Sequence, residues 1–292
     1  TYASDTAGIP DAGGVPHFPI LRSRFHVSHI RKATLRVVGL GFFHCYINGC
    51  EITLDRFLPL STDYEPRNDY PINEKLTGHR LYVPEYDVTE LLDEGENVLA
   101  LHFGGGWYTF EGEKSRFGDP KAIFRLIMET DNGVEEVVSS CADKIGDSYV
   151  KTYYFTNLEN HEYTGFDDAS LTREFDDRSW ANAVPAKPLD TEYLFCDCPA
   201  DREFELLDVV CTAETESGKV YDIGKNCANL PVLKLTGSKG STVILNCTET
   251  RNEDGTLNPP VIQRASFVSD GTGRIVQPMF TWFAYRYIHG YW

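Results

Sequence analysis

Short runs in which apolar and polar residues alternate dominate the chain. Residues 32–37 (Lys-Ala-Thr-Leu-Arg-Val) alternate with period two, which predicts a strand with one buried face. Residues 42–47 lead into an Asn-Gly pair at 48–49, which is typical of a tight hairpin turn because both turn residues need positive φ. Residues 50–54 are therefore expected to form the return strand. Residues 98–103 are almost continuously apolar, as expected of a central strand.

The rest of the chain repeats this pattern, and helical periodicity is nearly absent. A turn of helix is expected only within residues 87–95, where a capping residue opens the run and Gly95 closes it. Further strand-like runs cover 122–129, 136–141, 206–213, 220–223, 230–236, 242–249 and 280–288. Many short strands separated by turn residues predict an all-β fold of two consecutive β-sandwiches, of jelly-roll (galactose-binding-like) type. An α/β fold would need helices between the strands.

A change in composition divides the chain into two predicted domains. Residues 176–201 are acidic and contain three prolines, and Trp180 is expected to anchor this connection to a sandwich. We therefore predict one sandwich at 17–190 and a second at 200–292.

The charge balance restricts the partners. The 292 residues carry 44 acidic and 27 basic side chains, a formal net charge of −17. Nucleic acids and anionic membrane surfaces are disfavoured because they would be repelled, whereas a neutral sugar is compatible with this surface. No run approaches the roughly 18 apolar residues that a membrane span needs.

The eight cysteines are few for this length, and several lie in apolar strand-like runs, where a free thiol behaves as a small hydrophobe. Cys196 and Cys198 lack the C-x-x-C spacing of zinc or redox sites. We expect reduced thiols and a cytoplasmic location; a secreted disulfide framework is the alternative. The chain begins at Thr1 rather than methionine and ends at Trp292 after a strand-like run, so we expect a segment of something longer.

Signals for catalysis are weak. Neighbouring carboxylates are common in so acidic a chain, and adjacent strand residues point to opposite faces; the pairs are Glu111/Glu113, Glu159/Glu162, Asp167/Asp168 and Asp176/Asp177. The histidines lack zinc-enzyme spacing, and His44 and His102 are expected to be satisfied core or surface residues. No G-x-S-x-G elbow or phosphate loop is present. We predict no catalytic residue and no cofactor.

A sugar-binding loop is the remaining candidate site. Trp107 and Tyr108 follow three glycines at a strand end, where a loop could present their rings to the apolar face of a pyranose. Arg67, Asn68 and Asp69 are candidates to bind its hydroxyls. The alternative for Trp107 is a core anchor. Asp69 with loop carbonyls could instead hold a structural calcium ion.

Several runs, in order, resemble the N-terminal region of bacterial α-L-rhamnosidases. The resemblance covers about residues 20–290, and the order of the motifs is more specific than any one of them. The matching runs are Arg22-Ser23-Arg24-Phe25, 33–37, 41–49, Leu58-Pro59, Thr62-Asp63-Tyr64, 86–89, 95–99, 104–108, Glu162-Tyr163, 166–168 with Trp180, 221–226 (D-F-G-Q-N in the family), Glu249 with 254–257, and 280–288.

The resemblance implies an inverting glycoside hydrolase that removes terminal α-L-rhamnose, with sandwich domains ahead of a catalytic (α/α)₆ barrel. The sequence ends where that barrel should begin, so no catalytic residue is carried over, and the barrel and a rhamnose-containing glycan are the implied partners. Some related sandwiches bind rhamnose, sometimes with calcium. The chain departs from the family pattern at Ile223 and Lys225, at His161, which replaces a glycine, and at 227–229, where the family usually has a glycine.

Three functions stay open. The first is a non-catalytic accessory region of a rhamnosidase-like hydrolase, which predicts an exposed apolar patch, chiefly on the second sandwich. The second is an autonomous rhamnose-binding module that uses Trp107. The third is a self-sufficient enzyme.

Overall fold

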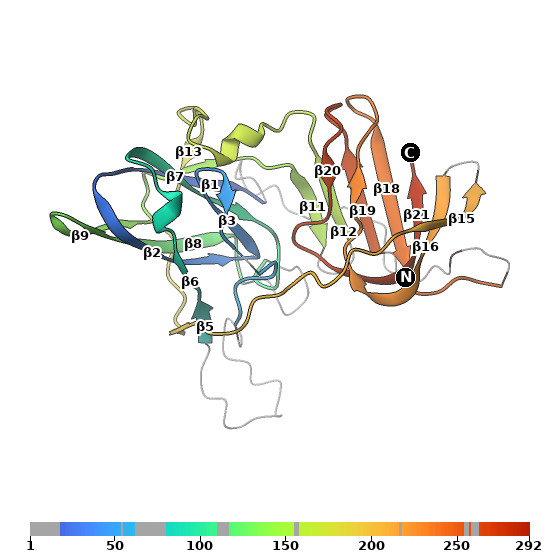
Figure 1. Ribbon diagram of the computed structural model, residues 1–292, viewed down its shortest axis with the longest axis horizontal. Helices are drawn as coiled ribbons and strands as arrows, with labels where there is room; N and C mark the ends of the chain where they lie inside the picture. Colours follow the sequence, from blue (N-terminus) through green and yellow to red (C-terminus); the bar gives the residue numbers. More distant parts are fainter. Residues whose placement is uncertain are drawn as a thin grey trace, which may run out of the picture.

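The computed structural model describes residues 18–53, 55–61, 80–109, 117–154, 158–215, 218–253, 257 and 263–292. These residues form β-strands in two lobes, with two short 3₁₀ helices, η2 (Thr89–Leu91) and η3 (Asp168–Leu171) (Figure 1). The predicted all-β fold is confirmed. Neither of these helices is long enough to cross a membrane.

The first lobe is a sandwich of a six-stranded and a four-stranded sheet. Leu35, Val37, Leu101 and Phe124 are among the buried side chains between them. The six-stranded sheet has the order β13 (Ala181–Asn182), β10 (Lys144–Gly146), β1 (Ile20–Val27), β7 (Gly95–Phe103), β3 (Phe43–Ile47) and β4 (Cys50–Glu51). The four-stranded sheet has the order β6 (Glu85–Asp87), β2 (Ile30–Leu40), β8 (Lys121–Thr130) and β9 (Gly133–Val138).

Local sequence explains the turns of this lobe. Asn48 and Gly49 have φ values of 51° and 86°, so the predicted hairpin joins β3 to β4. The return strand is only two residues long: Ile52 still donates from its backbone N to the Cys45 carbonyl at 2.9 Å, but the Cys45 N–H donates to the Thr53 hydroxyl at 3.2 Å instead of returning the ladder bond. The expected helix within 87–95 is reduced to η2, whose Thr89 N–H donates to the Asp87 carboxylate at 3.1 Å.

The second lobe is a seven-stranded sheet. Its order is β11 (Val150–Tyr154), β12 (Leu158–Glu162), β19 (Gln263–Val268), β18 (Thr242–Thr248), β21 (Phe283–Tyr291), β16 (Gly218–Asn229) and β15 (Val210–Thr215). A two-stranded sheet of β17 (Leu233–Lys234) and β20 (Ile275–Val276) accompanies it, and Leu233, Leu235 and Val276 pack in the core of this lobe.

The strands of the seven-stranded sheet do not come from one continuous stretch of the chain. β11 and β12 lie within residues 17–190, yet β12 pairs in parallel with β19 of the second lobe. The boundaries 17–190 and 200–292 stay a prediction, and the seven-stranded sheet draws residues from both ranges.

The acidic connection between the two predicted domains is ordered. β14 (Glu192–Phe195) pairs in parallel with β5 (Arg80–Val83), and residues 196–209 then run across to the second lobe (Figure 1). Trp180 packs as expected of an anchor: its ring lies 5.1 Å from that of Phe175, and a Cβ on Gly146 would come within 2.1 Å of it.

Candidate functional site

The outer face of the six-stranded sheet carries the most unusual side chains of the molecule. Alternation along β1, β3 and β7 directs Phe25, Cys45 and Leu101 into the core of the first lobe, while Arg22, His44 and His102 point the other way. Two groups result. We name Arg22, Arg24, Glu96 and Asp177 the arginine clamp, and His44, His102, His161 and Glu159 the histidine seam.

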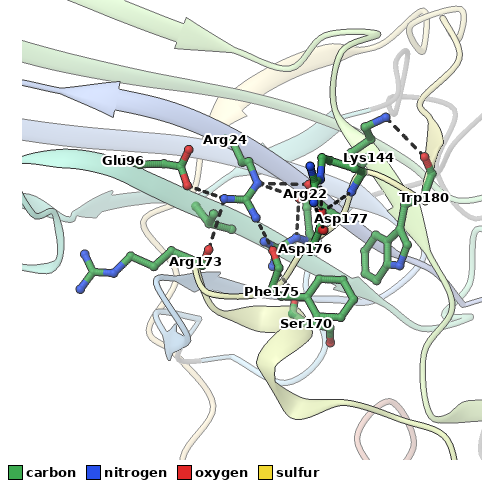
Figure 2. Close-up of polar contacts among 12 residues, drawn as sticks. Arg22, Arg24, Glu96, Lys144, Ser170, Arg173, Phe175, Asp176, Asp177 and Trp180 are labelled. Carbon is green, nitrogen blue, oxygen red and sulfur yellow. Dashed lines mark hydrogen bonds and ion pairs between the residues drawn. The ribbon is translucent and has the colours of Figure 1, made fainter.

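The arginine clamp fastens a distant segment to β1. Arg22 is 1% exposed, and its Nε donates to Asp177 Oδ2 at 2.9 Å while Nη1 donates to the carbonyls of Ser170 and Thr172. Arg24 Nε donates to the same carboxylate at 3.0 Å, and its Nη1 contacts Glu96 (Figure 2). Two arginines on one strand therefore hold the loop that follows η3.

The pKa shifts of Asp177 and Arg22 indicate which chemistry the clamp is suited to. Burial alone would raise the pKa of Asp177, but hydrogen bonds from Arg22 and Arg24 outweigh it and lower that pKa. Burial lowers the pKa of Arg22 despite the carboxylate, and its guanidinium carbon lies 5.3 Å from the Phe175 ring and 5.9 Å from the Trp180 ring. A carboxylate held ionised by two cations is suited to fixing structure and unsuited to donating a proton.

The histidine seam lies where the two lobes meet. His44 and His102 are paired residues on β3 and β7. His102 is 0% exposed, and neither ring nitrogen has a hydrogen-bond partner among the described residues. Its ring instead packs edge-on at 4.8 Å from Tyr149 and 5.0 Å from Phe280, both from the second lobe's core. The expectation of a satisfied core histidine is thus wrong for His102, which is buried but unsatisfied.

This environment fixes the charge of His102. Burial lowers its pKa well below the usual range, and the neighbouring His44 and His161 lower it further. His44 differs because its Nδ1 contacts the Glu51 carboxylate and its Nε2 lies 3.3 Å from the Met279 carbonyl. His102 is therefore neutral at the centre of the seam.

A buried carboxylate positions the segment that fills the seam. Glu159 is 0% exposed and accepts hydrogen bonds from the backbone N–H groups of Met279 (2.6 Å) and Phe280 (3.0 Å). The ring of Phe280 then lies so close to Gly104 that a Cβ there would come within 2.0 Å. Only glycine fits at 104, so the three-glycine run has a packing role.

His161 completes this arrangement without forming a catalytic site. Its Nε2 lies 2.5 Å from Glu159 and its Nδ1 lies 2.8 Å from the Tyr163 hydroxyl. The order of carboxylate, imidazole and hydroxyl is that of an acid–base relay, but the three residues are 0%, 1% and 4% exposed. Without access for a substrate, the relay serves to order the seam.

The carboxylate pairs suggested by the sequence do not converge where the structure describes them. Glu159 is buried while Glu162 is exposed. Asp167 caps η3 by accepting from the Ala169 N–H at 2.9 Å, whereas Asp168 pairs with Arg274 at 2.8 Å. Asp176 pairs with Arg178, and Asp177 belongs to the clamp. Glu111 and Glu113 lie outside the described residues.

The predicted sugar-binding residues are only partly placed by the structure. Trp107 is 52% exposed, but Tyr108 is 1% exposed, stacked 6.0 Å from the Phe117 ring. The expectation that the loop presents both rings is therefore wrong for Tyr108, because its ring fills a small core beside Val38 and Leu81. Arg67, Asn68 and Asp69, with the suggested calcium position, lie outside the described residues. In the part of the chain that is described, no three potential metal ligands cluster.

The runs that carried the resemblance in the second half meet on the seven-stranded sheet. Asp222 on β16 forms a two-point ion pair with Arg286 on β21, at 2.9 and 3.0 Å, which is the main cause that lowers the Asp222 pKa. Asn226 donates to Glu249 at 3.2 Å. Two polar pairs thus connect three runs that lie far apart in sequence, and sequence reasoning did not assemble them.

All eight cysteines have free thiols, and burial raises the pKa of Cys45 and Cys247. The thiols of Cys45 and Cys247 are therefore unreactive packing groups. The cytoplasmic location stays a prediction.

Comparison with known families defines the class of this protein. Residues 28–201 match the α-L-rhamnosidase N-terminal domain, and residues 213–289 match the bacterial α-L-rhamnosidase concanavalin-like domain. The chain belongs to the α-L-rhamnosidase family, as the first match alone covers more than half of it.

Individual relatives agree with this assignment. The chain is 26% identical over 284 residues to an α-L-rhamnosidase of Streptomyces avermitilis, covering 92% of this chain and 26% of the relative. It is 25% identical over 293 residues to one of Formosa agariphila, covering 92% of this chain and 29% of the relative. The chain thus spans about a quarter of the length of these curated relatives.

Solved structures show the same fold. The Streptomyces avermitilis α-L-rhamnosidase complexed with L-rhamnose superposes with a TM-score of 0.83 at 23% identity, covering 95% of this chain and 27% of that one. The α-L-rhamnosidase of Aspergillus terreus gives a TM-score of 0.78 at 21% identity, covering 95% and 32%.

Proposed function

We propose that this chain is the accessory β-sandwich region of a glycoside hydrolase that cleaves terminal α-L-rhamnosides. The observation that carries the proposal is the match of two rhamnosidase domain models in consecutive order, over a chain about a quarter as long as its relatives. The carboxylate pairs that could have been catalytic are committed to caps and ion pairs where they are described.

Exposed apolar residues support a packing role. Phe204 and Leu206 are 98% and 85% exposed, and Val209 and Val210 follow at the start of β15. β15 is an edge strand of the seven-stranded sheet, and an exposed apolar edge is a common docking surface. We infer that the catalytic part of the enzyme packs here.

A chimera tests the accessory role. The matching region of the Streptomyces avermitilis relative is replaced by this chain, and release of product from an aryl α-L-rhamnoside is measured. We expect this chimera to be soluble and active. A matched chimera that carries Phe204→Asp and Leu206→Asp should lose most of its activity or its soluble yield. A mutated chimera as active and stable as its parent would contradict packing at this edge.

A second function, sugar binding at the Trp107 loop, is favoured by the exposure of that indole. Calorimetry and tryptophan fluorescence with L-rhamnose, with and without calcium, test it. If the wild-type chain gives no heat of binding and no change in fluorescence on adding the sugar, and so behaves like Trp107→Ala, the loop does not bind it.

A further inference from the structure

The outer face of the four-stranded sheet carries an arrangement of charges that sheets usually avoid. Arg36 on β2 and Arg125 on β8 are direct cross-strand partners. Like charges directly opposite one another destabilise a sheet. The outer strands compensate: Glu85 on β6 is the partner of Arg36, and Glu136 on β9 pairs with Arg125. A row of two carboxylates and two guanidiniums thus crosses all four strands.

The two ion pairs do not use all the guanidinium N–H donors. Arg36 contacts Glu85 through Nε at 2.6 Å, and Arg125 contacts Glu136 through Nε at 2.9 Å and Nη2 at 2.6 Å. Both Nη groups of Arg36 and Nη1 of Arg125 have no partner among the residues that the structure describes. The two side chains are 51% and 52% exposed, so both guanidinium groups are open to solvent.

An apolar depression adjoins the arginines. Its volume is about 180 Å³, and it is lined by Arg36, Arg125 and Tyr193 together with the apolar side chains of Val38, Val83, Ile123 and Phe124. Ile123 and Tyr193 are 54% and 41% exposed. Tyr193 belongs to β14, which pairs with β5, so the connection between the lobes supplies the aromatic wall.

We propose that this depression binds a neutral sugar residue. The two guanidiniums are balanced by two carboxylates, so the site offers no excess charge to an ion. The remaining N–H donors suit sugar hydroxyls, while Tyr193 and the aliphatic lining suit the C–H face of a pyranose ring. The choice of an L-rhamnoside as probe rests on the proposed function; the site itself does not.

Titration with methyl α-L-rhamnoside tests the site, followed by NMR shifts of the Arg36 and Arg125 side-chain N–H groups and the Ile123 methyls. We expect saturable shifts at these groups. Tyr193→Ala and Arg36→Met should each weaken binding by about tenfold, which corresponds to about 1.4 kcal/mol. Arg31→Met is the matched control, because Arg31 pairs with Asp131 at 2.7 Å on the same strand and lies outside the depression; its affinity should be unchanged.

Other outcomes would overturn the proposal. If no shifts appear at these groups, or if Tyr193→Ala leaves the shifts unchanged, the depression is not a binding site. If D-glucuronate binds more tightly and its binding weakens with salt, the ligand is anionic rather than neutral. Trp107→Ala separates this site from the Trp107 loop, since it should leave the shifts intact. An active chimera without shifts would reject this site and keep the accessory function.

Discussion

Arg22 of the arginine clamp and His102 of the histidine seam lie on the same face of the six-stranded sheet, but their surroundings treat charge in opposite ways. In the clamp, buried Arg22 meets the Asp177 carboxylate and two backbone carbonyls. In the seam, buried His102 packs against the edges of Tyr149 and Phe280 and has no side-chain hydrogen bond among the described residues. A cation that cannot lose its proton needs partners, whereas an imidazole can be buried without them by staying neutral. The clamp should therefore depend on its partner and the seam on pH.

The largest effect is expected where the lobes interlock. Phe280→Ala should lower the free energy of unfolding by about 4 kcal/mol, because it removes a fully buried ring and leaves a cavity between the lobes. Denaturant unfolding measures this. Leu206→Ala is the control, since Leu206 is 85% exposed; an equal loss in both variants would show that Phe280 does not join the lobes.

The clamp should respond to loss of its carboxylate. Asp177→Ala leaves Arg22 charged and buried, so we expect a loss of about 3 kcal/mol in unfolding free energy. Asp176→Ala changes the adjacent carboxylate, whose partner Arg178 is exposed, and should change stability little. If the two variants unfold alike, the clamp contributes nothing specific.

The seam should respond to pH. The folded pKa of His102 lies well below 6.5, so the unfolded chain binds the extra proton first. This contribution to stability is present above the unfolded pKa of about 6.5 and is lost as the pH falls below it, so the free energy of unfolding should decrease on acidification.

The variant His102→Phe isolates this dependence. It should remove that part of the slope, whereas His26→Gln, a change at an exposed histidine of β1, should keep it. Identical slopes in wild type and His102→Phe would mean that His102 is not the group responsible.

The local sequence pattern was enough to predict the strands that bury one face and one of the hairpin turns. Residues 32–37 lie in β2, and the Asn48-Gly49 turn follows β3, because alternation and positive φ are properties of neighbouring residues. The prediction for 280–288 was less complete: β21 begins at Phe283, and Phe280 precedes it in the seam. Burial of Phe280 depends on Glu159, far away in sequence.

The site was harder to predict for the same reason. Arg22 and Asp177 were each noticed, but 155 residues separate them, and no local rule joins them. His161 stands where the family has a glycine, and this departure was the one sequence signal for the seam. It could not be interpreted because the sequence does not show which residues surround it. Tyr108 was misplaced because a residue after a glycine run can turn either inward or outward, and the cover from Phe117 decides.

Incubating the isolated chain with an aryl α-L-rhamnoside tests whether this chain is an accessory region without hydrolase activity of its own. We predict release no faster than in a blank, because the neighbouring carboxylates that the structure describes are engaged in a helix cap, ion pairs and buried contacts rather than gathered at an open site. Saturable turnover that vanishes when the chain is heat-denatured would contradict the account.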